Sequence, residues 1–268
     1  MHLVKLGGSV ITDKSRPLAF RPQVARRLAR ELAPSVGGGL VVVHGAGSFG
    51  HVDAARYGLR EGLKGPRQLF GAASVQWDVR DLDLRVVGAL LDARIPAVSI
   101  PPGAFLELED GVLQRFDAVP FQRALARGLV PVTFGDVLPD TERGVGIVSG
   151  DTLMSALASA LRPDVSIFVT AEDGVYDKDP ALRGARLLPE VSPANAPRPT
   201  RRARSARGGA ADVTGAMGGK LVEAFEVAAH SGRTWVVGGR PGVLRAALAG
   251  KDPRGTRVKA WPCDEVKE

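Results

Sequence analysis

The chain has 268 residues, of which 44% are hydrophobic, 24% are charged and 5% are aromatic, and its formal net charge is +7. This size allows one large domain or two modest ones, and the few aromatics argue against stacking platforms for single-stranded nucleic acid. No apolar run approaches the roughly 18 residues of a membrane span, no signal-peptide pattern opens the chain, and Cys263 is the only cysteine. We therefore expect a cytoplasmic protein with no disulfide, no Cys-based metal site, and neither membrane nor nucleic acid as a partner.

Short apolar runs alternate with longer amphipathic segments along the whole chain. In chain order we expect a strand at 2–6, a helix at 22–36, strands at 40–44 and 97–100 around a helix at 78–93, a β-hairpin at 105–117, a strand at 130–134, a helix at 151–163, a strand at 165–170, a helix at 220–232 and a strand at 234–237. Asp151 is the expected N-cap of the helix that begins there. The alternation predicts an α/β fold with a mainly parallel sheet covered on both faces. A boundary near residue 164 is reasonable.

Two glycine-rich turns in the first 51 residues carry the main functional signal. The first is KLGGSVITDK at 5–14, and the second is HGAGSFGH at 44–51, which directly follows the apolar run 40–43. Glycines bring backbone N–H groups close to a ligand, and such groups at a strand-to-helix junction form an anion site. Two such turns in one small protein indicate two phosphate groups held near each other, as a kinase requires.

Two other nucleotide-binding motifs fit the sequence poorly. Residues 45–50 match the dinucleotide-binding pattern G-x-G-x-x-G, but the following stretch 64–81 has no strand that ends in an acidic residue. A P-loop requires G-x-x-x-x-G-K-[ST], whereas GAMGGKL at 215–221 has different spacing and no hydroxyl residue after the lysine.

An arginine cluster accounts for most of the positive charge. Without its five members the net charge would be +2 (7 − 5), and the members are Arg198, Arg201, Arg202, Arg204 and Arg207. The surrounding residues are rich in Pro, Ala, Gly and Ser, so a solvated surface loop is the simplest interpretation. A lid over nucleotide phosphates is the second interpretation, and a nucleic-acid-binding tail is the third.

Five motifs occur in one order and cover most of the chain: KLGGSVITDK, HGAGSFGH, SGDTL at 149–153, EDGVYDKDP at 172–180 and DVTGAMGGK at 212–220. Together they resemble the amino acid kinase superfamily, and the first two are similar to those of the isopentenyl phosphate kinases. The resemblance implies a three-layer α/β/α sandwich with a mainly parallel central sheet, in which 1–164 binds the acceptor, isopentenyl phosphate, and 165–268 binds ATP. It also implies a homodimer, and a reaction that gives isopentenyl diphosphate and ADP.

The resemblance assigns roles residue by residue. The catalytic residues would be Lys5, Lys14, His51, Asp151 and Lys220. ATP would contact Lys5, Gly7, Gly8, Ser9, Ala46, Asp173, Gly174, Gly215, Gly219 and Lys220. The acceptor would contact Gly45, Gly47, Gly50, His51, Gly150 and Val79, and its alkyl tail would lie near Phe70, Val75, Val79, Leu82 and Val86. Ala46 departs from the family pattern of three successive glycines, and TAED at 170–173 lacks an additional aspartate that is common there.

The chemistry of phosphoryl transfer explains these residue types. A phosphate monoester has a second pKa of about 6, so the acceptor needs no general base, and His51 is expected to act as a hydrogen-bond donor. Magnesium is expected with ATP, held mainly by phosphates and water, without a metal cage from the protein. A fosfomycin kinase or another small-molecule kinase of the same fold remains an alternative, and a non-catalytic nucleotide sensor is a more remote one.

Overall fold

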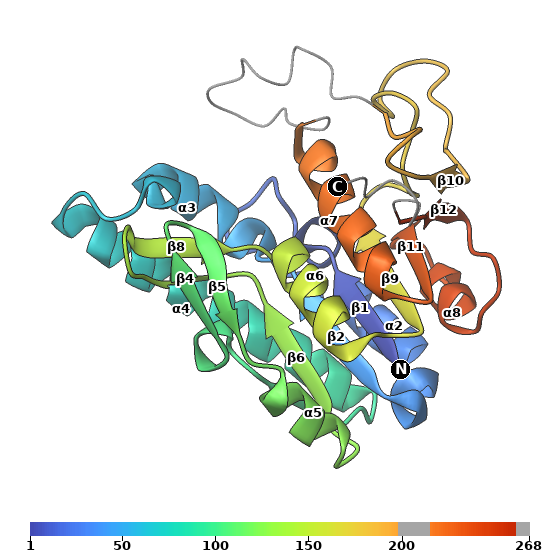
Figure 1. Ribbon diagram of the computed structural model, residues 1–268, viewed down its shortest axis with the longest axis horizontal. Helices are drawn as coiled ribbons and strands as arrows, with labels where there is room; N and C mark the ends of the chain where they lie inside the picture. Colours follow the sequence, from blue (N-terminus) through green and yellow to red (C-terminus); the bar gives the residue numbers. More distant parts are fainter. Residues whose placement is uncertain (198–214, 261–268) are drawn as a thin grey trace, which may run out of the picture.

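An eight-stranded sheet forms the centre of the computed structural model, which describes residues 1–197 and 215–260, with only the backbone described for 215–220. Its strand order is β10-β12-β11-β9-β1-β2-β6-β3, parallel from β11 to β3, while β12 runs antiparallel to β11. A four-stranded sheet, β5-β4-β7-β8, lies beside it (Figure 1). The strands are β1 (His2–Leu6), β2 (Leu40–His44), β3 (Ala97–Ser99), β4 (Leu106–Glu109), β5 (Val112–Phe116), β6 (Val130–Phe134), β7 (Asp136–Asp140), β8 (Gly144–Val148), β9 (Val165–Thr170), β10 (Glu190–Val191), β11 (Arg233–Gly238) and β12 (Gly255–Val258).

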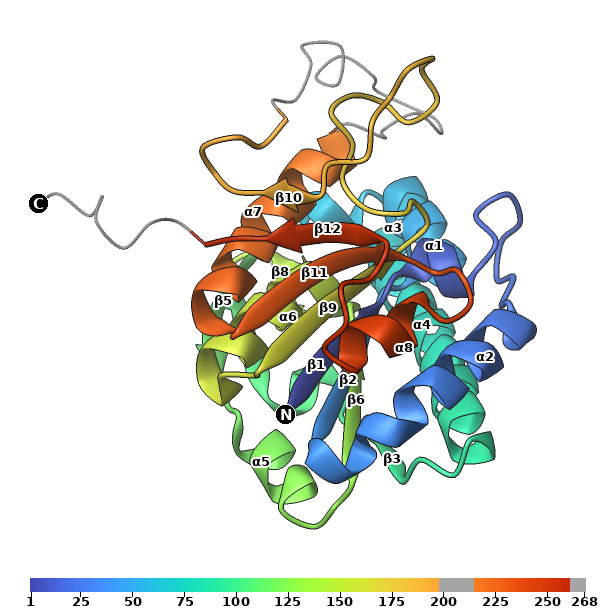
Figure 2. The same ribbon diagram turned by 90° about the vertical axis from the view of Figure 1, so that its right-hand side faces the viewer.

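Helices cover both faces of the large sheet. Figure 2 shows α2, α4 and α8 on one side and α6 and α7 on the other. The helices are α1 (Gly8–Ile11), α2 (Pro22–Leu32), α3 (His51–Tyr57), α4 (Pro66–Asp92), α5 (Val119–Leu125), α6 (Gly150–Leu161), α7 (Gly215–His230) and α8 (Val243–Leu248), with 3₁₀ turns η1 (Ala33–Gly38), η2 (Gly47–Phe49), η3 (Leu59–Glu61) and η4 (Pro102–Ala104). The expected three-layer α/β/α arrangement is confirmed.

Side chains that alternate along each strand fill two separate cores. Val4 and Val42 belong to the core that α2, α4 and α8 cover, whereas Leu3 and Val41 belong to the core under α6 and α7. Successive side chains of a strand point to opposite faces, so a strand that is covered on both sides is apolar throughout. This is why β2 reads as a continuous apolar run at 40–43, while β1 is apolar except at His2 and Lys5.

Several expected elements differ from the observed ones. The helix expected at 78–93 begins twelve residues earlier, as α4 at Pro66. The prediction missed its first half because Phe70 and Trp77 are apolar but exposed, which obscures the helical periodicity there. The expected N-cap of α6, Asp151, is wrong: the Oγ atom of Ser149 accepts the N–H of Thr152 at 3.0 Å, and Asp151 lies in the first turn. The expected hairpin is confirmed as β4 and β5. Strands β7, β8, β10 and β12 were not expected.

Residues 1–164 and 165–268 share one sheet. Strand β1 lies between β2 and β9, and it pairs in parallel with both. The chain leaves β1 by way of α2 on one face and reaches β9 by way of α6 on the other. At such a position the carboxyl ends of parallel strands open into a crevice, where ligands bind in α/β proteins.

Candidate functional site

A cavity of about 700 Å³ opens at the carboxyl ends of β1, β2 and β9. Both glycine turns contribute to it. The expected site residues that line it are Lys5, Gly7, Gly8, Ser9, Lys14, Gly45, Ala46, Gly50, His51, Val79, Gly150 and Asp151. These twelve expected residues therefore line one cavity, and their roles stay predictions.

The two glycine turns pack directly against each other. A Cβ atom built on Gly8 would lie 2.3 Å from the backbone nitrogen of Gly47, and one on Gly45 would lie 2.8 Å from the nitrogen of Gly8. Gly47 has a φ of +53°, and a Cβ there would lie 2.2 Å from Oγ1 of Thr12. The Thr12 hydroxyl in turn accepts the N–H of Ser48 at 3.0 Å. Side chains larger than hydrogen would separate the turns and the N–H groups that they present.

Lys5 and Asp151 form an ion pair at one end of the cavity. Nζ of Lys5 lies 2.5 Å from Oδ1 of Asp151, and both side chains are largely buried. Lys5 is the penultimate residue of β1, and the first turn of α6 holds Asp151 because Ser149 caps that helix. Sequence reasoning missed Ser149, although a serine two residues before an expected helical aspartate fits an N-cap.

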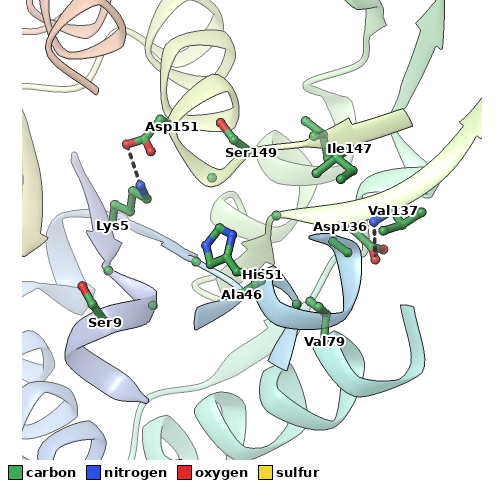
Figure 3. Close-up of a pocket in the computed structure, with 18 of the residues that line it drawn as sticks. Lys5, Ser9, Ala46, His51, Val79, Asp136, Val137, Ile147, Ser149 and Asp151 are labelled. Atoms are coloured by element: carbon green, nitrogen blue, oxygen red, sulfur yellow. Dashed lines mark hydrogen bonds and ion pairs between the residues drawn. The ribbon is translucent and has the colours of Figure 1, made fainter. Parts of the chain in front are cut away.

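His51 is the first residue of α3 and lines the cavity. Figure 3 shows its ring between the Lys5–Asp151 pair on one side and Val79 and Ile147 on the other. A donor at this position can contact an anion held by the glycine turns. The neighbouring His44 differs, because it is fully buried and its Nε2 lies 3.2 Å from Oδ1 of Asp83. His44 is thus part of the structural core.

The end of the cavity beyond His51 is apolar. Its wall includes Val75 and Val79 of α4, Val137 of β7 and Ile147 of β8 (Figure 3 labels the last three). Three other residues expected around an alkyl tail lie elsewhere: Phe70 is 71% exposed, and Leu82 and Val86 are buried in the core under the large sheet. Helical periodicity identified the buried apolar residues of α4. It did not show which of them face the cavity and which face the core of the large sheet.

Asp136 is a buried carboxylate beside this apolar wall, and sequence reasoning missed it. It is 2% exposed, lines the cavity and begins β7. Its Oδ1 accepts the N–H of Val137 at 2.8 Å, and its Oδ2 lies 3.1 Å from Nη2 of Arg80. Burial raises the pKa of Asp136 to about 6, against the opposing effect of Arg80. A carboxylate two residues after the buried strand 130–134 was the available signal.

The comparisons with known proteins agree with this geometry. A family model described as "Amino acid kinase family" matches residues 1–239. The chain belongs to the amino acid kinase family. The isopentenyl phosphate kinase of Methanothermobacter thermautotrophicus is 35% identical over 96% of this chain and 98% of its own, and that of Thermoplasma acidophilum is 42% identical over 67% and 71%. A solved isopentenyl phosphate kinase structure superposes with a TM-score of 0.82 at 33% identity, covering 96% of this chain and 99% of its own.

Some residues that the kinase resemblance implied do not line the cavity. Gly47 is buried behind it against Thr12. Asp173 is buried with its carboxylate between Arg240, at 2.7 Å, and Arg254, at 3.0 Å, and Gly174 packs against Thr256. These contacts shape the loop after β9, and their expected part in ATP binding stays a prediction.

The structure does not describe the side chains of several other expected residues. Gly215 and Gly219 lie in α7, where only the backbone is described, and the same holds for Lys220. The arginine cluster at 198–207 and Cys263 lie outside the described residues.

Two further properties concern the described part of this kinase. Residues 1–197 and 215–260 contain no group of three or more His, Cys, Asp or Glu side chains arranged to hold a metal ion. None of the helices in the same ranges has the length and apolar character needed to cross a membrane.

Proposed function

We propose that this protein transfers the γ-phosphoryl group of ATP to isopentenyl phosphate and releases isopentenyl diphosphate and ADP. The observation that carries the proposal is the near full-length match to isopentenyl phosphate kinases, in sequence and in structure. The cavity fits such an acceptor, because glycine turns and cationic side chains at one end give way to an apolar wall at the other. An alkyl phosphate likewise has an anionic group at one end and an apolar tail at the other.

We infer that catalysis is mainly positioning and charge stabilisation, as phosphoryl transfer requires. Lys5 would bridge the donor and acceptor phosphates, and Asp151 would hold its ammonium group in place through their 2.5 Å contact. The N–H groups of the two glycine turns would hold phosphate oxygens. His51 would donate a hydrogen bond to the acceptor phosphate, which is already largely dianionic at neutral pH. Lys14 and Lys220 would contact the phosphates of ATP.

The division of labour between the two parts of the chain is also a proposal. The apolar wall residues Val75, Val79, Val137 and Ile147 all come from 1–164, which supports acceptor binding by that part. ATP would then bind mainly to 165–268. Magnesium would neutralise phosphate charge while bound to phosphates and water. We also propose a cytoplasmic location, where ATP is available.

We further propose a homodimer that forms through α4. Four apolar residues at seven-residue intervals along this helix, Phe70, Trp77, Leu84 and Leu91, are each more than half exposed. Such a spacing gives a straight stripe on one face, as in helices that pair. Light scattering should give a mass of two chains, and Trp77→Glu should shift it toward one. A single-chain mass for the unaltered protein would refute this assembly.

The decisive experiment measures ADP release with a panel of acceptors. Isopentenyl phosphate should give the highest kcat/KM, dimethylallyl phosphate a comparable or lower one, and fosfomycin little, because the apolar wall offers its polar groups no partner. Higher activity with fosfomycin would favour the alternative kinase. ATP binding without ADP release for any acceptor would favour a nucleotide sensor.

A further inference from the structure

Polar contacts join the two walls of the apolar end of the cavity. Nε2 of Gln76, on α4, donates to the backbone carbonyl of Val137, on β7, at 2.9 Å. One helical turn later, Nη2 of Arg80 lies 3.1 Å from Oδ2 of Asp136, the first residue of β7. These contacts tie a helix of the outer layer to a strand of the small sheet across the cavity wall.

We propose that Gln76, Arg80 and Asp136 form a clamp that sets the width of the acceptor cavity and so selects short alkyl phosphates. This inference rests on the proposed function, and it concerns positioning residues rather than groups that contact the reacting atoms. Each member of the clamp is adjacent in sequence to a wall residue: Gln76 follows Val75, Arg80 follows Val79, and Asp136 precedes Val137. A shift at the clamp must therefore move the wall.

The spacing on α4 explains how the clamp acts on both wall residues of this helix. Val75 and Val79 are four residues apart, so they lie one above the other on the face toward the cavity. Gln76 and Arg80 have the same spacing and therefore form a second row beside the first. Two contacts one turn apart fix both the distance of α4 from β7 and its rotation about its own axis. A single contact would leave the rotation free.

The surroundings of Asp136 favour such a role over one in stability. The carboxylate is 2% exposed, and besides Arg80 it is near the carboxylate of Asp83 on α4 and the imidazole of His44 on β2. Burial raises its pKa to about 6, so the ionised form that pairs with Arg80 is held at a cost to the folded state. The pair joins this buried carboxylate to a guanidinium that is 38% exposed, so it contributes little net stability, but it fixes geometry.

The test compares clamp variants with a matched control on the same helix. The clamp variants are Gln76→Met, Arg80→Gln, Arg80→Lys and Asp136→Asn. The control is Asp81→Asn, which removes an ion pair of α4 with Arg85 that is exposed and stays within the helix. For each protein we would measure kcat and KM with ATP, isopentenyl phosphate and the ten-carbon geranyl phosphate, together with the melting temperature.

The clamp predicts a selective effect on the acceptor. Gln76→Met, Arg80→Gln and Asp136→Asn should each raise the KM for isopentenyl phosphate about tenfold, leave the KM for ATP within about twofold, and raise the ratio of kcat/KM for geranyl to isopentenyl phosphate at least about tenfold. Arg80→Lys should fall between these variants and the unaltered protein. Asp81→Asn should behave like the unaltered protein.

Different failures separate this inference from the proposed function. If the unaltered protein phosphorylates isopentenyl phosphate but the clamp variants keep its KM and selectivity, the clamp is refuted and the function stands. An effect of Asp136→Asn without one of Arg80→Gln would also refute the clamp, since it would mean a direct contact of Asp136 with the acceptor. Equal losses toward ATP and acceptor with a lower melting temperature would show a purely structural role. If the unaltered protein does not use isopentenyl phosphate, the proposed function fails first.

Discussion

Replacing Gly8 by alanine should disable the enzyme without unfolding it. The added methyl group would lie 2.3 Å from the nitrogen and 2.6 Å from the Cα atom of Gly47, where ordinary contacts begin near 3.4 Å. Both atoms belong to backbone, so one glycine turn must move away from the other by about 1 Å. A misplacement of that size at a catalytic centre can cost about a hundredfold in rate. We therefore expect kcat/KM for both substrates to fall by about a hundredfold or more.

A steady-state assay of ADP release, paired with circular dichroism, tests this expectation. Gly37→Ala is the matched control, because Gly37 lies exposed in η1 with no atom within 4 Å of an added Cβ. It should keep kcat/KM within about twofold. If Gly8→Ala is folded and retains more than about a third of the activity, the close packing of the turns does not position the phosphates, and the reasoning is wrong.

Three further predictions use other parts of the site. His51→Ala should lower kcat/KM about 10²- to 10³-fold with ATP binding unchanged. His51→Gln should recover part of the rate, since an amide can donate a hydrogen bond, and a glutamine variant as inactive as the alanine variant would contradict a simple donor role. Val79→Ala should improve the relative use of ten-carbon prenyl phosphates, each extra buried methylene contributing about 0.8 kcal/mol; unchanged selectivity would mean that Val79 does not bound the tail. The pKa of Asp136 is about 6 in the folded protein rather than the ordinary 3.8, so between these pH values the folded state binds more protons than the unfolded state. The ionised carboxylate therefore lowers the free energy of unfolding. This destabilisation should grow as the pH rises to about 6 and approach about 3 kcal/mol. Denaturant unfolding of Asp136→Asn and the unaltered protein near pH 5 and pH 7.5 measures this, and an equal difference at both pH values would contradict it.

The sequence predicted six of the eight strands of the large sheet, and both glycine turns, because their signals are local. Strand β2 is apolar on both faces, so it is visible as the short uninterrupted run 40–43. The turns are recognisable because close backbone approach, as between Gly8 and Gly47, tolerates glycine alone. The two-residue turn Asp110-Gly111 similarly predicted the hairpin of β4 and β5.

The parts that the sequence did not predict depend on contacts between distant residues. Strand β8 reads GVGIV and β7 contains Pro139, so neither shows an apolar alternation; their antiparallel pairing defines them. The pairing of Asp136 with Arg80 joins residues 56 positions apart, and no local pattern indicates it. The apolar wall was only partly predicted for the same reason, because α4 is buried on more than one side.

The position of β1 has a consequence for how the chain can be divided. Cutting at 164 would leave a first fragment in which β1 still pairs with β2, and a second fragment in which β9 keeps β11 but has lost β1 from its other edge. The exposed edge of β9 would carry unpaired N–H and C=O groups between apolar faces, which favours aggregation. The second fragment should therefore be insoluble when expressed alone and should be rescued by co-expression with the first. Strand β1, which is synthesised first, should thus make the two parts of the chain one folding unit.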